Sequence, residues 1–285
     1  MIINAKSGLK NSKAQLLDVI DVFCHYGYTV TTYVTQQHKD AYRYIMSNRI
    51  RYDVICVFGG DGTMNEVTNA LMRKKHKPLL GYFPSGTMND FGSNFDLGND
   101  FKEIAEKICK GNTKPFDVGK INDYYFNYVA AFGEMCDVPF TTDRNVKEIL
   151  GNIAYILEGI SKLSEIRSHK VRYTINGKEY YKDVLFGLIY SGNRVAGMEL
   201  ETRKNARVDD GLFNVLIVEY VPSIFEVPDI FTTIVQNEKY IQTFQSDKIS
   251  LEFDDDIIWT LDGEEAKIKN KAEITIKNKA LKLLA

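Results

Sequence analysis

The first part of the chain alternates short apolar runs with segments of helical periodicity. Strands are predicted for four runs rich in apolar or β-branched residues, at 1–4, 29–34, 54–58 and 79–83. Helices are predicted between them, where apolar residues recur three or four positions apart, at 16–24, 41–48 and 65–73. The last two strands show no polar alternation, which is typical of strands buried on both faces of a parallel sheet. This order predicts a doubly wound α/β domain with a mostly parallel sheet.

The pattern changes after about residue 117. Strand-like alternation then dominates, and strands are predicted at 124–131, 170–175, 179–190, 212–219, 248–253 and 257–261. Helical periodicity is confined to 145–163 and to an apolar stripe at 223–236, which could pack onto a core or cover a lipid cavity. We therefore expect an α/β domain at 1–118 and a largely antiparallel β-sandwich domain at 119–271, with the active site in the cleft between them. The final segment, 272–285, could return to the first domain.

Composition narrows the class of protein. The chain has 285 residues, a length that suggests two domains or one large one. Its 44% hydrophobic and 26% charged residues are typical of an ordinary soluble globular protein. A net charge of −2 gives no support to nucleic-acid binding. No CxxC or Cys/His cluster indicates zinc, and no segment resembles a signal peptide or a membrane span. We expect a cytoplasmic protein, with peripheral contact to the inner face of a membrane left open.

The most informative segment follows the strand at 54–58. Three glycines, Gly59, Gly60 and Gly62, surround Asp61 at the point where a helix begins. Such a turn leaves backbone N–H groups at a helix N-terminus, where phosphate binds, and glycine allows close backbone approach to a ligand. The alternative is a tight turn in which Asp61 caps the helix. One glycine would suffice for that, so the three favour a phosphate loop.

Four further short segments contain polar or charged residues that could bind a ligand or a metal ion. Residues 4–8 and 85–90 follow two other predicted strands and could also reach phosphate or ribose. The segment 206–211 contains paired carboxylates beside a glycine, which suit a hard cation such as Mg²⁺ or merely cap a β turn. The segment 261–265, with two adjacent glutamates after Asp-Gly, could be only a solvated hairpin turn.

In this order, GGDGTMNEV, PSGTMNDF, ARVDDG and LDGEE resemble the diacylglycerol kinase catalytic family of lipid kinases. The resemblance extends from Asn4 to Glu265. The GGDGT segment alone is shared with NAD kinases, whereas Asn89-Asp90-Phe91 and the DDG segment point to the lipid branch. The resemblance implies an ATP-dependent kinase that phosphorylates a lipid hydroxyl, most simply that of diacylglycerol, giving phosphatidic acid.

The resemblance also implies roles for matching residues. The implied ATP contacts are Asn4, Ala5, Lys6, Ser7, Gly8, Thr35, Gly59, Gly60, Asp61, Gly62, Thr63, Met64, Asn65, Glu66 and Thr87. Asp61 would act on the catalytic metal and the phosphates, and Asp117 would join a metal–water network. Asp210, with the backbone carbonyls of Arg207 and Leu212, resembles a structural Mg²⁺ site. Glu264 matches the general base; without the resemblance it could not be distinguished from Glu265.

The sequence departs from the family pattern in three places. Ala5 replaces a common proline, Gly92-Ser93 replace a common Ala-Arg, and Ala196-Gly197 replace paired glycines. A basic phosphate contact is therefore missing or supplied by Lys6.

The expected partner is a lipid at a membrane surface, and an edge strand of the β domain could pair with a second copy. The basic run at 73–77 could meet anionic lipid, although cations are also favoured at any helix C-terminus. The alternatives are an NAD kinase or other small-molecule kinase on the same scaffold, and a catalytically silent nucleotide- or lipid-binding regulator.

Overall fold

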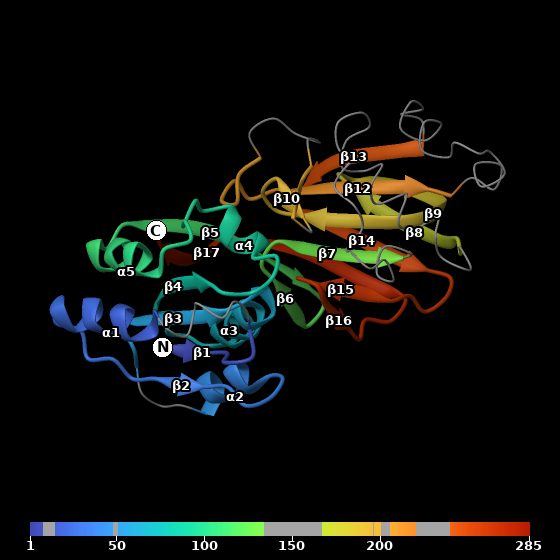
Figure 1. The fold of residues 1–285 in the computed structure, drawn as a ribbon. Helices are drawn as coiled ribbons and strands as arrows, with labels where there is room; N and C mark the ends of the chain where they lie inside the picture. Colours follow the sequence, from blue (N-terminus) through green and yellow to red (C-terminus); the bar gives the residue numbers. More distant parts are fainter. Residues whose placement is uncertain (8–14, 48–50, 134–166, 196, 201–205, 221–239) are drawn as a thin grey trace, which may run out of the picture. The chain divides into compact units, whose positions relative to one another are not determined.

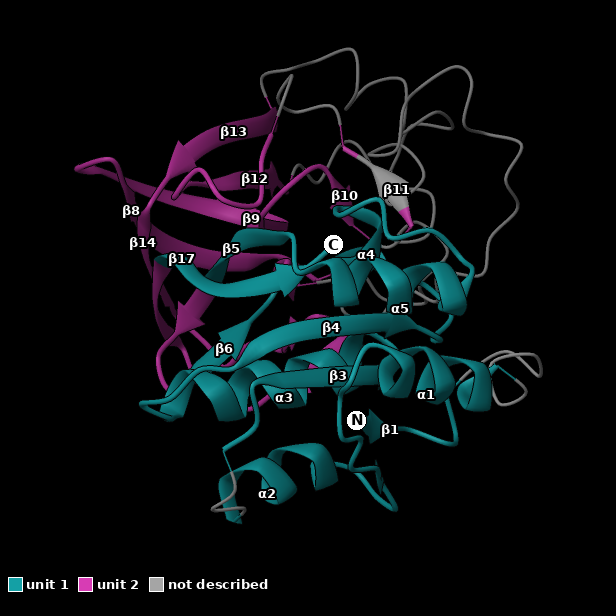
Figure 2. Cartoon of the chain, turned by 90° about the vertical axis from the view of Figure 1, so that its left-hand side faces the viewer, with its two compact units in different colours: residues 1–118, 124–127, 277–285 teal, residues 119–123, 128–276 magenta. Residues whose placement is uncertain are grey.

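The computed structural model describes residues 1–7, 15–47, 51–133, 167–195, 197–200, 206–220 and 240–285 (Figure 1). The chain divides into two units (Figure 2). Unit 1 comprises residues 1–118, 124–127 and 277–285, and unit 2 comprises residues 119–123 and 128–276. The predicted helices at 145–163 and 223–236 lie outside the described residues.

Unit 1 contains a parallel sheet in the order β17–β4–β3–β1–β2. Its strands are β1 (Ile2–Ile3), β2 (Tyr33–Val34), β3 (Val54–Gly59), β4 (Leu79–Pro84) and the last part of β17 (Lys271–Leu284). The sheet has β3 at its centre, which fits the unbroken apolar run of that strand. The prediction of a mostly parallel α/β domain is confirmed.

Among the described residues of unit 1, the helices are α1 (Leu16–His25), α2 (Asp40–Ser47), α3 (Asp61–Arg73), α4 (Asp90–Ser93) and α5 (Phe101–Lys110). One face of the sheet is covered by α1 and α5, because Phe23 and Phe101 both pack edge-on against Phe83 of β4. The sequence analysis missed α5, although it carries clear end signals. Asp100 accepts hydrogen bonds from two N–H groups at its start, and Gly111 ends it in the left-handed conformation.

The start of α3 differs from the prediction. The helix begins at Asp61, four residues before the expected Asn65, and its N-cap is Gly60. The alternative in which Asp61 caps this helix is therefore wrong. The glycine-rich turn is shorter than expected, because Gly62 and Thr63 already belong to the first turn of α3.

Unit 2 is antiparallel throughout its described pairings. Its strands include β7 (Val129–Gly133), β8 (His169–Ile175), β9 (Lys178–Tyr190), β12 (Phe213–Glu219), β13 (Ile241–Ser246), β14 (Lys248–Phe253), β15 (Trp259–Leu261) and β16 (Glu264–Ala266). A small hairpin joins β10 (Arg194–Val195) to β11 (Met198–Glu199). The long strand β9 pairs with β7, β8 and β12. Trp259 and Phe186 are among the largest fully buried side chains of unit 2. The predicted antiparallel β-rich domain is confirmed.

Two strands contain residues of both units: β17, and β5 (Thr113–Ile121), which the sequence analysis did not predict. The predicted strand at 124–131 is two strands, β6 (Tyr124–Phe126) in unit 1 and β7 in unit 2. Asn127 and Tyr128 separate them. The Asn127 side chain accepts a hydrogen bond from Thr68 of α3, at 2.7 Å. Within the described residues, no helix is long and apolar enough to cross a membrane.

Candidate active site

Three loops of unit 1 meet at the carboxyl ends of β1, β3 and β4, where open parallel sheets bind ligands. The loop after β1 is tied to the other two by side chains. Asn4 Nδ2 donates to Thr63 Oγ1 at 3.1 Å, and the hydroxyls of Ser7 and Ser85 lie 3.2 Å apart. Ser7 also donates to the Asn4 carbonyl at 2.7 Å. The structure thus brings together the three segments that the sequence analysis selected separately, except Gly8, which lies outside the described residues.

The loops after β3 and β4 touch through glycines. A Cβ added at Gly86 would lie 2.5 Å from the Cα of Gly60, and one added at Gly60 would lie 3.0 Å from the Cα of Gly86. Asn89 fixes the second loop, because its side chain accepts from Gly86 N and donates to Gly86 O. Asn89 itself has a φ of 55°. Backbone packing this close requires glycine at both positions.

Replacing Gly86 with alanine should therefore separate the two loops. No backbone atom can move aside as a flexible side chain would, so we expect the affinity for ATP to fall about tenfold or more. Equilibrium binding of ATP would measure this, with thermal unfolding as the control for folding. Wild-type affinity in a folded Gly86→Ala protein would contradict the prediction.

Asp61 lies between these loops and fastens them. Its Oδ2 accepts a hydrogen bond from Asp90 N at 3.2 Å, and its Oδ1 accepts from Phe91 N at 3.1 Å. The carboxylate thus binds N–H groups in the first turn of α4, in the loop after β4. Asp90 is almost fully buried, at 1% exposure. The loops therefore carry two carboxylates, Asp61 and Asp90, one from each of the two segments selected in the sequence analysis.

The sequence analysis missed Tyr82 of β4. Its ring is fully buried against Phe91, and its hydroxyl has no hydrogen-bond partner among the described residues. Burial, together with the charges of Asp61 and Asp90, holds the pKa of Tyr82 well above its ordinary value. The hydroxyl is therefore a neutral donor beside two acids. An apolar run such as 79–83 hides a tyrosine of this kind among core residues.

Tyr82 also explains one departure from the family pattern. A Cβ at Gly92 would lie 3.0 Å from the Tyr82 ring, so glycine makes room for the ring there. Ser93 donates its hydroxyl proton to the Asn89 carbonyl at 3.1 Å. Ala5 is exposed in its turn, whereas Ala196 lies outside the described residues.

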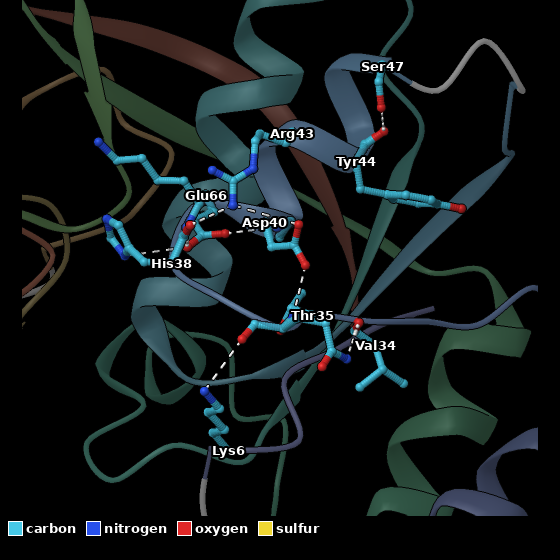
Figure 3. A network of polar contacts seen from close by, with 12 residues as sticks. Lys6, Val34, Thr35, His38, Asp40, Arg43, Tyr44, Ser47 and Glu66 are labelled. Carbon is cyan, nitrogen blue, oxygen red and sulfur yellow. Dashed lines mark hydrogen bonds and ion pairs between the residues drawn. The ribbon is translucent and has the colours of Figure 1, made fainter.

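A polar network surrounds the start of α2 (Figure 3). Glu66 accepts from Lys39 N at 2.6 Å and from Ala41 N at 3.0 Å, and thereby ties α3 to that start. Thr35 N donates to Ile3 O at 2.9 Å, in the β1–β2 pairing. Lys6 Nζ lies 3.4 Å from the Gln36 carbonyl. These contacts give Thr35 and Glu66 structural roles, and their predicted ATP contacts stay predictions.

Two other predicted residues of unit 1, Asn65 and Asp117, have contacts within that unit. Asn65 donates to the Tyr125 carbonyl at 3.2 Å. Asp117 of β5 is buried, and its Oδ1 accepts from Asn278 Nδ2 at 2.9 Å and from Lys279 N at 2.6 Å. Thr87 is exposed on the loop after β4. The structure assigns Asp117 to the anchoring of β17, and its part in a metal–water network stays a prediction.

In unit 2, the segment 261–265 forms the β15–β16 hairpin. Asp262 and Gly263 both have positive φ, 51° and 85°, as a two-residue turn requires. Asp262 is not solvated: it is 3% exposed, and its Oδ1 accepts from Tyr128 N at 3.0 Å and from Val129 N at 3.2 Å. The turn is therefore clamped to β7, and it presents an exposed Glu264 at a fixed position.

The two carboxylates of segment 206–211 have different contacts. Arg207 donates to both oxygens of Asp209, at 2.8 and 2.9 Å. Asp210 Oδ1 accepts from Leu212 N at 3.1 Å. Because Asp209 is engaged by Arg207, the hard oxygen donors that suit Mg²⁺ at this turn are those of Asp210 and the backbone carbonyls. In the described part of the chain, no three His, Cys, Asp or Glu residues cluster as a metal site.

Comparison with known proteins decides the family. Residues 1–121 match the family model of the diacylglycerol kinase catalytic domain, and residues 136–285 match that of the YegS C-terminal NAD kinase beta sandwich-like domain. The diacylglycerol kinase of Staphylococcus aureus (strain MRSA252) is 34% identical over 223 residues, which are 77% of this chain and 70% of the relative. The chain belongs to the diacylglycerol kinase catalytic family.

Solved structures agree with this family. The crystal structure of a diacylglycerol kinase from Bacillus anthracis str. Sterne matches with a TM-score of 0.78 and 25% identity, over 99% of this chain and 95% of that one. An NAD kinase from Archaeoglobus fulgidus in complex with ATP matches with a TM-score of 0.54 and 12% identity, over 100% and 92% of the two chains. The second likeness shows the fold alone. Within the family, Asp61 and Asp117 belong to the catalytic-domain match, and Asp210 and Glu264 to the β-domain match.

Proposed function

We propose that this protein is an ATP-dependent lipid kinase that transfers the γ-phosphate to the hydroxyl of diacylglycerol and produces phosphatidic acid. The observation that carries the proposal is the junction of the three strand-end loops, held by Asn4–Thr63, Gly60–Gly86 and Asp61–Phe91 contacts, in a chain of the diacylglycerol kinase family. Phosphoryl transfer needs alignment and charge stabilisation more than covalent help from the protein, and rigid loops supply alignment.

The nucleotide would bind along these loops. The N-cap of α3, Gly60, offers no side chain to the first turn of the helix, so backbone N–H groups of that turn face the loop without a capping side chain. Gly60 and Gly86 keep the floor of the loops free of Cβ atoms. This fits phosphate oxygens, which need donors at close range.

Mg²⁺, when bound, supplies positive charge to the phosphate oxygens. Asp61 would hold the catalytic ion at the loops, and Asp210, with the carbonyls of Arg207 and Leu212, would hold a structural ion in unit 2. Glu264 would accept the proton of the lipid hydroxyl as its oxygen attacks the γ-phosphorus. The bond from that phosphorus to the β–γ bridging oxygen would break, and ADP would leave. General-base catalysis of this kind contributes roughly 10²–10⁴ in rate. The reaction would take place at a membrane surface, on its cytoplasmic side.

The test is transfer of labelled γ-phosphate from ATP with Mg²⁺, to mixed micelles of diacylglycerol, sphingosine, ceramide or phosphatidylglycerol, and to NAD in parallel. We expect label in phosphatidic acid. Label on NAD alone would move the protein to the NAD kinases. Bound ATP with no transfer to any acceptor would contradict the proposal and favour a silent binding protein.

A further inference from the structure

Unit 1 contains a cavity of about 600 Å³ at the other end of its sheet. Among the residues that line it are Met1 at the start of β1, Val54 at the start of β3 and Pro78 just before β4. The candidate ATP loops follow the opposite ends of these strands. Six residues of β3 separate the two ends, a length of about 20 Å. The cavity is therefore distinct from the loops at Gly60 and Gly86.

The wall of the cavity is largely apolar and comes from helices on both faces of the sheet. Its buried side chains include Ile2, Phe23, Ile45, Ile55, Leu71 and Ile108. Tyr44 and Tyr52 also line it, and their hydroxyls are 3.1 Å apart. Tyr44 is held in place by stacking on Tyr33, with ring centroids 3.8 Å apart. A volume of about 600 Å³ lies within the range of roughly 300–1,000 Å³ that holds small molecules.

The charged side chains that line the cavity are all positive. Lys74, Lys75 and His76 approach it from the end of α3, and Arg51 approaches from the segment before β3. Among the lining residues, all of them within the described part of the chain, none is Asp or Glu. The whole chain has a net charge of −2, so this concentration of cations does not reflect composition.

The helix dipole explains part of this arrangement, because cations are stabilised at any helix C-terminus. It does not explain Arg51, which belongs to another segment and lines the same cavity. Nor does it explain why these cations line a largely apolar cavity rather than lying on an open surface. His76 is oriented by the Tyr52 carbonyl, at 3.4 Å from its Nε2.

We propose that this cavity binds a small organic anion with an apolar body, whose charged group lies among Arg51, Lys74, Lys75 and His76. The apolar body would occupy the space bounded by Phe23, Ile55 and Ile108. The inference does not depend on the proposed kinase activity, since the cavity and the candidate ATP loops lie at opposite ends of the same strands.

The test uses 8-anilinonaphthalene-1-sulfonate, an aromatic anion that fluoresces when it enters an apolar site. We expect one saturable site per chain, which excess ADP with Mg²⁺ does not displace and which weakens as salt rises. The neutral analogue N-phenyl-1-naphthylamine has the same aromatic body without the sulfonate and should bind at least about tenfold more weakly.

Two variants locate the site. Lys74→Ala/Lys75→Ala should weaken binding of the sulfonate about tenfold, whereas the matched pair Lys102→Ala/Lys110→Ala, on exposed positions of α5 that do not line the cavity, should leave it unchanged. Thr29→Trp, at an exposed position of the lining, should block the cavity and abolish binding without loss of thermal stability. Displacement by ADP, equal binding of the neutral analogue, or wild-type binding by the folded Lys74→Ala/Lys75→Ala and Thr29→Trp proteins would overturn the proposal.

Discussion

Replacing Asp61 with asparagine should lower the rate of phosphate transfer by about a hundredfold or more. The substitution keeps the size of the side chain and removes its charge, which the proposed catalytic ion needs. It also places an amide where Asp90 N or Phe91 N now donates to a carboxylate oxygen. The loop after β4 would then lose one of its two anchors to α3, at a cost comparable to the loss of a helix cap, about 0.5–2 kcal/mol.

Asp100→Asn is the matched control, because Asp100 Oδ1 accepts hydrogen bonds from two backbone N–H groups, Lys102 N at 2.8 Å and Glu103 N at 3.1 Å. Both variants lose a carboxylate that serves the start of a helix in unit 1, but only Asp61 lies at the strand-end loops. Initial rates of labelled phosphate transfer and the free energy of unfolding should be measured for both. Asp100→Asn keeps both hydrogen bonds through its amide oxygen, so it should be close to wild type in stability and rate, whereas Asp61→Asn should lose rate and up to about 2 kcal/mol of stability. A rate for Asp61→Asn within threefold of that of Asp100→Asn would show that the carboxylate is structural.

The sequence predicted which loops meet because the rule for parallel sheets is local. Strands buried on both faces, separated by helices, place their carboxyl ends along one edge, and the polar turns after Ile3, Gly59 and Pro84 therefore had to be neighbours. The contacts within that edge were not predictable in the same way. Which N–H groups the Asp61 carboxylate binds depends on the path of the chain from Pro84 to Phe91. Residue pattern does not encode that path.

The strand at 124–131 was predicted wrongly because its division depends on contacts with residues distant in the sequence. The run at 124–131 is continuous in β propensity, yet it divides at Asn127 and Tyr128. Thr68 binds the first of these side chains, and Asp262, 134 residues away, binds the backbone N–H of the second. The same contact explains why Asp262 is buried, although Asp-Gly in a hairpin turn is usually solvated. The missed helix α5 is a different case, because its end signals at Asp100 and Gly111 were present in the sequence.

The second large expected loss of activity concerns the two glutamates that follow the Asp262-Gly263 turn, Glu264 and Glu265. Glu264→Gln should lower kcat roughly 10²–10⁴-fold, because glutamine retains the shape of the side chain but cannot take up the proton of the lipid hydroxyl. Glu265→Gln should stay within about twofold of wild type, since adjacent strand residues point to opposite faces. The two residues pair across the hairpin with Leu261 and Thr260, respectively, so they are matched in position and exposure and differ in the face they occupy.

The separate effects on kcat and KM distinguish a base from a residue that only binds substrate. With Glu264 as the base, Glu264→Gln should lower kcat and kcat/KM by similar factors, whereas loss of a binding contact alone would raise KM and leave kcat unchanged. Because both glutamates are exposed, neither substitution should change the free energy of unfolding by more than about 0.5 kcal/mol. A wild-type kcat in Glu264→Gln together with a large loss of kcat in Glu265→Gln would transfer the role to Glu265. The clamp of Asp262 on Tyr128 and Val129 would then fix the hairpin with its other face toward the lipid.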